Sequence, residues 1–149
     1  MGLLYDYSKG EPFHPNGIGM ARPKHAHQDV LLTAAMNMAI ELKSKGYKIL
    51  PESTVTTDWD DLAPDLVIFD KSMHPLCMIE IVTHRQVHAD IEKCNELMSR
   101  FPNAQYFVYD YEKKVLYMYA HESEEWVSSE DYELYFRYLS QPMISYFID

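Results

Sequence analysis

Two short apolar runs separated by a polar turn constrain the fold of this chain more than any other feature. Leu66–Phe69 (LVIF) and Leu76–Val82 (LCMIEIV) are almost continuous in apolar residues, and the segment DKSMHP lies between them. Such runs are typical of strands that are covered on both faces, and the short polar connection favours a hairpin. The sequence therefore predicts two neighbouring strands inside a sheet, the second of which carries one charged residue, Glu80.

A long helix is expected before these strands and a second one after them. The first begins at Asp29, because VLLTAAMNMAIELKSKG contains good helix formers, and Gly46 stands where a helix would end. Its apolar residues lie on nearly all sides, which indicates a central helix or one that also forms a subunit contact. The second helix is expected at His88–Phe101, where apolar residues recur at three- and four-residue steps.

The other segments complete a single domain. Tyr47–Thr57 favours a strand that Pro51 breaks or marks as an edge, and strands are also expected at Ala104–Tyr109 and Val115–Tyr119. We divide the chain into an irregular arm (1–27), a core (28–120) and an aromatic, helical extension (121–149) that Pro142 interrupts. The element order predicts an α/β fold, in which helices pack on a mixed sheet.

The charge balance bears on partners and location. With 13 basic and 23 acidic residues the net charge is −10, which weakens the expectation of nucleic-acid binding through phosphates. No stretch is apolar enough to span a membrane, and we expect no secretory signal. The two cysteines, Cys77 and Cys94, are too few for a disulfide framework, so we expect reduced thiols and a cytoplasmic location.

Two carboxylates lie where neighbouring strands could bring them together. Asp65 precedes the first apolar run, and Glu80 lies within the second. Adjacent strands are ~4.8 Å apart, so carboxylates at matched heights can share one cation. A hard divalent ion takes one or two carboxylates together with water and phosphate. The pattern favours a metal site, although Asp65 could serve only a turn and Glu80 only a salt bridge.

Two further charged residues could join this site. Glu52 lies on the preceding β-like segment, and its alternative is a solvated surface position. Lys93 borders the apolar face of the second helix, and its stem could bring the ammonium group toward the sheet. There it could orient a water molecule or offset phosphate charge, or it could pair only with acidic neighbours on the helix.

At this point the chain resembles a known family. The segments PDLVIFD, MIEIVTH and DIEKCNELMSRFPNAQYFVYD together resemble the Uma2-like (DUF820) group of the PD-(D/E)XK restriction-endonuclease-like superfamily, over roughly residues 29 to 119. The matching elements are Pro64–Asp65, Glu80–Thr83, Asp90 with Lys93, and Tyr106–Asp110. The resemblance implies a restriction-endonuclease-like mixed sheet flanked by helices, and hydrolysis of nucleic-acid phosphodiester bonds with Mg²⁺ or Mn²⁺.

The chain departs from the family pattern at two points. The superfamily usually has a lysine two residues after the glutamate, where this chain has Val82, and the resemblance implies that Lys93 replaces it. Pro102–Ala104 stands where the group tends to have Gly-Val, so the chain would be a divergent member. The expected site residues are Asp65, Glu80, the backbone carbonyl of Ile81, Lys93 and Glu52, with Thr83, His84 and Asp90 in the same pocket.

Other residues suggest weaker sites. His25, His27, His84 and His88 do not form the four-ligand pattern of a structural zinc site. The aromatic tail could stack nucleic-acid bases, but such residues more often pack on a core or at a subunit interface.

Three functions are consistent with the sequence. The first is a divalent-metal-dependent endonuclease. The second is a catalytically inactive nuclease-fold module for binding or assembly, which the acidic charge and the missing strand lysine favour. The third is a subunit whose partner supplies the basic nucleic-acid surface. The apolar first helix and the aromatic tail are also compatible with a homodimer.

Overall fold

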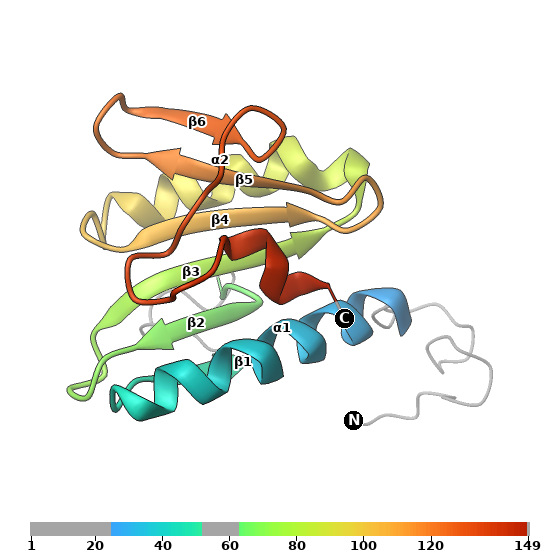
Figure 1. Cartoon of the computed structure of the whole chain (residues 1–149). Coiled ribbons are helices and arrows are strands. Elements are labelled where there is room, and N and C mark those ends of the chain that lie inside the picture. The colour runs from blue at the N-terminus through green and yellow to red at the C-terminus, as the bar shows by residue number, and fades with distance from the viewer. Residues whose placement is uncertain (1–24, 52–62, 149) are drawn as a thin grey trace, which may run out of the picture.

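The computed structural model describes residues 25–51 and 63–148, which form a six-stranded sheet between two layers of helix (Figure 1). The strands follow one another across the sheet in chain order, from β1 to β6. Only β3 and β4 are parallel, and α2 connects them. The elements are α1 (His25–Ser44), β1 (Lys48–Pro51), β2 (Leu66–Phe69), β3 (Pro75–Val82), the 3₁₀ helix η3 (His84–Gln86), α2 (Val87–Met98), β4 (Gln105–Asp110), β5 (Val115–Ala120), β6 (Glu125–Ser128) and the 3₁₀ helix η4 (Met143–Phe147).

Each face of the sheet has its own hydrophobic core. α1 and η4 cover one face, and α2 covers the other (Figure 1). Along β3, Ile79 and Ile81 pack in the first core, whereas Met78 and Val82 pack in the second. Because successive side chains of a strand point to opposite faces, Glu80 faces the α2 side.

Two turns are shaped by single residues. α1 is followed by Gly46, whose φ of 81° places it in the left-handed region, and Tyr47 N–H donates to the Leu42 carbonyl oxygen at 3.0 Å. Both features are typical of a glycine-terminated helix. Between β2 and β3, the Asp70 side chain accepts hydrogen bonds from two backbone N–H groups of the turn, those of Ser72 and His74.

The fold class and most elements predicted from the sequence are confirmed. The apolar runs form β2 and β3, joined by the expected hairpin, and α2 lies within one to three residues of its predicted ends. β1 is an edge strand, as Pro51 indicated, and residues 52–57 of the segment predicted as a strand lie outside the described residues. None of the described helices is long and apolar enough to cross a membrane.

Two predicted boundaries are wrong. α1 begins at His25, so residues 25–27 belong to the helix, and the rest of the predicted arm (1–24) lies outside the described residues. The segment 121–149 is not a helical extension: it contributes β6 and η4, and residues 132–142 run between them without helix. That segment is held by Gln105, whose side chain donates to the Tyr135 carbonyl oxygen and accepts from Arg137 N–H. These bonds satisfy backbone groups that a helix would otherwise pair.

Candidate functional site

Asp65 and Glu80 lie side by side at the end of the β2–β3 pair. The register pairs Leu66 with Ile79, and the two carboxylates are the next residues on their strands. Asp65 Oδ2 accepts a 2.8 Å hydrogen bond from the backbone N–H of Ile81, so the aspartate is fixed against β3. The apolar runs that form the strands therefore also align these two side chains.

Glu80 is buried in contact with Lys93. Its side chain is 2% exposed, and its Oε2 atom lies 3.0 Å from Lys93 Nζ. The same Nζ atom also donates a 3.0 Å hydrogen bond to the carbonyl oxygen of Ala63. Among the residues that the structure describes, Oε2 receives no hydrogen bond of good geometry. Lys93 Nζ thus contacts both the buried carboxyl group and the backbone.

The electrostatics of the site favour a protonated Glu80. Burial and the nearby carboxylate of Asp65 raise the pKa of Glu80 from 4.5 to about 8, although Lys93 acts in the opposite direction. Burial by itself lowers the pKa of Lys93, but Glu80 and the other carboxylates raise it above its ordinary value. The ammonium therefore stays charged, while the carboxyl holds a proton near neutral pH.

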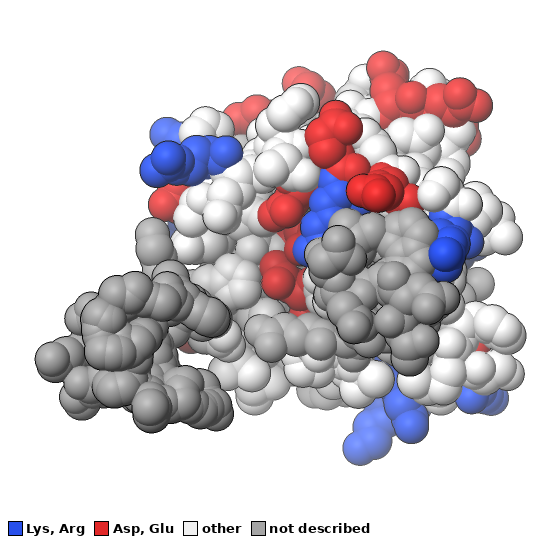
Figure 2. Space-filling view, turned by 180° about the vertical axis from the view of Figure 1, so that it is seen from behind, with Lys and Arg blue, Asp and Glu red and all other residues white. Residues whose placement is uncertain are grey.

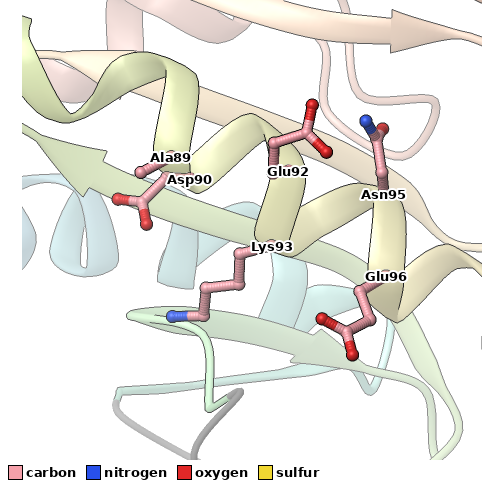
Figure 3. A pocket seen from close by; sticks show the side chains of 6 residues that line it. All are labelled: Ala89, Asp90, Glu92, Lys93, Asn95 and Glu96. Carbon is pink, nitrogen blue, oxygen red and sulfur yellow. The ribbon is translucent and has the colours of Figure 1, made fainter.

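Asp90 is the third acidic group near Lys93. Burial and Asp65 raise the pKa of Asp90, and the positive charge of Lys93 opposes this shift. Both residues line a hollow of about 640 Å³ beside α2 (Figure 3). In that view Lys93 and Glu96 extend from the helix in one direction, whereas Glu92 and Asn95 extend in the other. Lys93 thus lines the hollow and also reaches the buried Glu80.

His27 also reaches this site, although the sequence did not indicate it. It lies in the first turn of α1, and its Nε2 atom is 3.4 Å from Asp65 Oδ2. Its ring packs edge-on against Tyr111, with the centroids 6.2 Å apart. His27 and Asp65 are 38 positions apart in the sequence, and no local pattern predicts which strand the beginning of α1 will meet.

Thr83 and His84 contact other groups. The Thr83 side chain donates to Gln86 Oε1, next to η3. His84 Nδ1 lies 2.7 Å from Asp110 Oδ2, and its backbone N–H donates to Glu112. Asp110 is fully buried, and its other oxygen accepts the backbone N–H groups of Glu112 and Lys113. His84 therefore pairs with the end of β4, and its described contacts do not include Glu80.

The three described carboxylates near Lys93 do not converge on one metal-binding point. Within residues 25–51 and 63–148, no group of three or more His, Cys, Asp or Glu side chains has an arrangement that could hold a metal ion. Glu52, predicted to assist, lies outside the described residues. Acidic and basic side chains lie next to one another at the centre of the face shown in Figure 2. Among the described residues, the site combines the acidic Asp65, Glu80 and Asp90 with the basic Lys93.

Comparison with known proteins supports the fold. No family model matches the chain, and no curated protein matches it. Among solved structures, it is similar to a protein from Anabaena variabilis described as a "putative nuclease belonging to DUF820", with a TM-score of 0.59 and 13% identity over 87% of each chain. The resemblance seen in the sequence is thereby confirmed at the level of the fold: this chain has the nuclease-like fold of a DUF820 protein.

Proposed function

We propose that the protein is a divalent-metal-dependent nuclease that hydrolyses phosphodiester bonds of nucleic acid at Asp65, Glu80 and Lys93. The observation that carries this proposal is Glu80, a carboxyl group 2% exposed within a central strand, next to a second carboxylate and an ammonium group. Such a group is costly to bury, and perturbed carboxyls of this kind are concentrated at functional sites. The shared fold with a DUF820 protein supports the same assignment.

The residues present fit a hard divalent ion such as Mg²⁺ or Mn²⁺. Such ions need only one or two protein carboxylates, with water and substrate phosphate completing the coordination. Asp65 and Glu80 would supply these carboxylates, and the backbone carbonyl of Ile81 would be a third ligand. Glu80 Oε2 lacks a well-directed hydrogen bond, and its raised pKa indicates that Lys93 does not fully compensate the two acids. When bound, the ion would activate a water molecule and stabilise charge on the leaving oxygen.

The chain's own residues would position the substrate. Lys93 lines the hollow beside α2, so its ammonium group would attract a phosphate and orient the attacking water. The Ile81 N–H and His27 hold the Asp65 carboxylate in one orientation. The free, buried thiols of Cys77 and Cys94 support a reducing, cytoplasmic setting.

Cleavage of plasmid and single-stranded DNA, with and without Mn²⁺ or Mg²⁺, tests the proposal. We expect metal-dependent cleavage that Glu80→Gln and Asp65→Asn reduce at least a hundredfold, because both would be ligands. Glu130→Gln is the matched control: it removes an exposed carboxylate that does not line the hollow and should leave the rate unchanged. Equal cleavage by wild type and Glu80→Gln would show that another site, or a contaminant, is responsible.

Calorimetry with Mn²⁺ tests metal binding separately from turnover. Because Glu80 holds a proton near neutral pH, metal binding should release protons, and the heat should vary with the ionisation enthalpy of the buffer. Glu80→Gln should abolish this proton release. Binding that is identical in wild type and in Glu80→Gln would place the metal elsewhere.

A catalytically inactive module for binding or assembly is the second candidate. It is favoured by the contact between Lys93 and Glu80, which already places a positive charge where a metal would bind, and by the net charge of −10. In that case Lys93→Met should not create metal binding, and wild type should show neither binding nor cleavage.

A further inference from the structure

The outward face of α1 carries a row of exposed apolar side chains. Leu32, Met36 and Ile40 are 55%, 69% and 80% exposed, and they follow one another at four-residue steps. Residues with this spacing form one ridge along a helix. The opposite side of α1, with Leu31 and Met38, is buried in the core, so the ridge is additional to the contacts that hold the helix in the fold.

A charged residue lies beyond each end of this ridge, and the two charges are opposite. Asp29 lies seven residues before Met36, and Lys43 lies seven residues after it; both are exposed. Seven residues are nearly two helical turns, so both charges lie on the same face as Met36. Leu32 and Ile40 are likewise placed at equal distances on either side of Met36. If a second α1 helix packs against this face in the opposite direction, apolar side chains therefore meet apolar ones, and Asp29 meets Lys43.

We propose that this face pairs with the same face of a second copy of the chain, with the two α1 helices antiparallel and a twofold axis at Met36. Leu32 then packs against the partner's Ile40, and Met36 packs against the partner's Met36. Asp29 meets the partner's Lys43, and the symmetry repeats each contact. The pairing is self-complementary, so it requires no other surface of the molecule.

The charge of the molecule limits how strong this dimer can be. Two copies with a net charge of −10 repel each other, but Asp29 and Lys43, which flank the ridge, have opposite charges that balance. α1 has 20 residues, and a helix of this length is about 30 Å long. Two such helices bury less area than a standard interface, so we expect a reversible dimer with a dissociation constant on the order of micromolar. The candidate site on the α2 face stays open in this dimer.

Sedimentation velocity of the full chain over a wide concentration range tests the proposal. We expect wild type to change from monomer to dimer as its concentration rises. Met36→Arg should be monomeric at every concentration, because it places two like charges at the axis. Met73→Arg is the matched control, since Met73 is exposed but lies in the β2–β3 turn, and it should dimerise like wild type. Circular dichroism verifies that each variant is folded.

Charge reversal tests the direction of pairing. Asp29→Lys alone and Lys43→Asp alone should each weaken the dimer several-fold, and the double variant should restore it. A wild type that stays monomeric at all concentrations, or a dimer that Met36→Arg leaves intact, overturns the proposal. In the first case another segment of this chain or a different protein covers the ridge.

Disulfide formation under mild oxidation tests the register. Met36→Cys should cross-link to itself, because residue 36 lies at the axis, whereas Leu32→Cys alone should not. A mixture of Leu32→Cys and Ile40→Cys chains should form the mixed disulfide. Self-linking of Leu32→Cys as efficient as that of Met36→Cys would contradict the proposed register. None of these outcomes depends on nuclease activity.

Discussion

Lys93 Nζ lies 3.0 Å from Glu80 Oε2 and donates to the Ala63 carbonyl oxygen, so one ammonium group connects α2 with β3 and with the segment that enters β2. Glu80 alone would be a carboxyl group buried beside another carboxylate, Asp65. The Lys93 ammonium group reduces the free-energy cost of burying the ionised Glu80 but does not remove it, because the pKa of Glu80 is still raised. The site therefore has an unfavourable electrostatic energy that depends on pH and that single substitutions can reveal.

The stability of the metal-free protein should fall as pH rises from about 5 to about 8. In this window an unfolded Glu80 is ionised, whereas the folded one keeps its proton because its pKa is raised to about 8. The unfolded state then binds fewer protons, so the free energy of unfolding decreases, by up to about 1.4 kcal/mol per pH unit from this group. Urea denaturation in EDTA should show this slope in wild type and much less of it in Glu80→Gln.

The exposed carboxylate Glu92 provides the control for that measurement. Glu92→Gln should keep the wild-type slope, because it removes a carboxyl group of the same helix that is not buried. A Glu80→Gln profile as steep as the wild-type one would show that other groups cause the pH dependence.

Removing the Lys93 ammonium group should lower the free energy of unfolding mainly when Glu80 is present. Lys93→Met leaves the buried carboxyl without its counter-charge and the Ala63 carbonyl without its donor, so we expect a loss of about 3 kcal/mol at pH 8. The double variant Lys93→Met/Glu80→Gln should recover most of this loss. Urea midpoints of the four proteins give the coupling energy, and additive effects would mean that the two groups do not interact.

Asp110 should matter more for stability than its partner His84. Asp110→Ala leaves two turn N–H groups without their acceptor, so we expect a loss of about 3 kcal/mol in urea denaturation. Asp110→Asn keeps one oxygen and should cost less. His84→Ala loses one contact of a half-exposed ring and should cost about 1 kcal/mol. Equal losses for Asp110→Ala and His84→Ala would contradict this order.

Gly46→Ala should destabilise the protein through its backbone. At a φ of 81° an alanine is strained, and we expect a loss of about 1–2 kcal/mol, measured by thermal unfolding. An added Cβ would also clash with Lys71 Cε, but that side chain is flexible and can move. The same loss is therefore expected in a Lys71→Ala background. A much smaller loss in that background would identify the cause as the clash with Lys71.

The sequence predicts the centre of this fold better than its margins. β2 and β3 could be located because continuous apolar runs have few alternatives to a buried strand, and Glu80 was noticeable because it interrupts one. β6 was missed, because Glu125–Ser128 is short and lies at the sheet edge, where burial imposes little pattern. The helix expected before Pro142 does not form, and Gln105 instead binds the extended backbone of that segment.

The candidate site was predictable to the same degree. Asp65 and Lys93 lie within one or two elements of Glu80, so strand register and helix periodicity could relate them. His27 reaches Asp65 only through the packing of α1 on the sheet, and Asp110 meets His84 only through the parallel pairing of β3 and β4. Contacts of this kind depend on tertiary structure, which local sequence patterns do not encode.

The three charged residues of the candidate site lie close together in the sequence, just before β2, on β3 and on α2. Asp65, Glu80 and Lys93 all lie in one unbroken stretch of the chain, from the residue before β2 to α2, and β5, β6 and η4 supply none of them. Substitutions in those outer elements can therefore accumulate without moving the acidic pair or its lysine, provided that the core volume is kept. For protein engineering, the outer strands are the natural place to graft new binding surfaces.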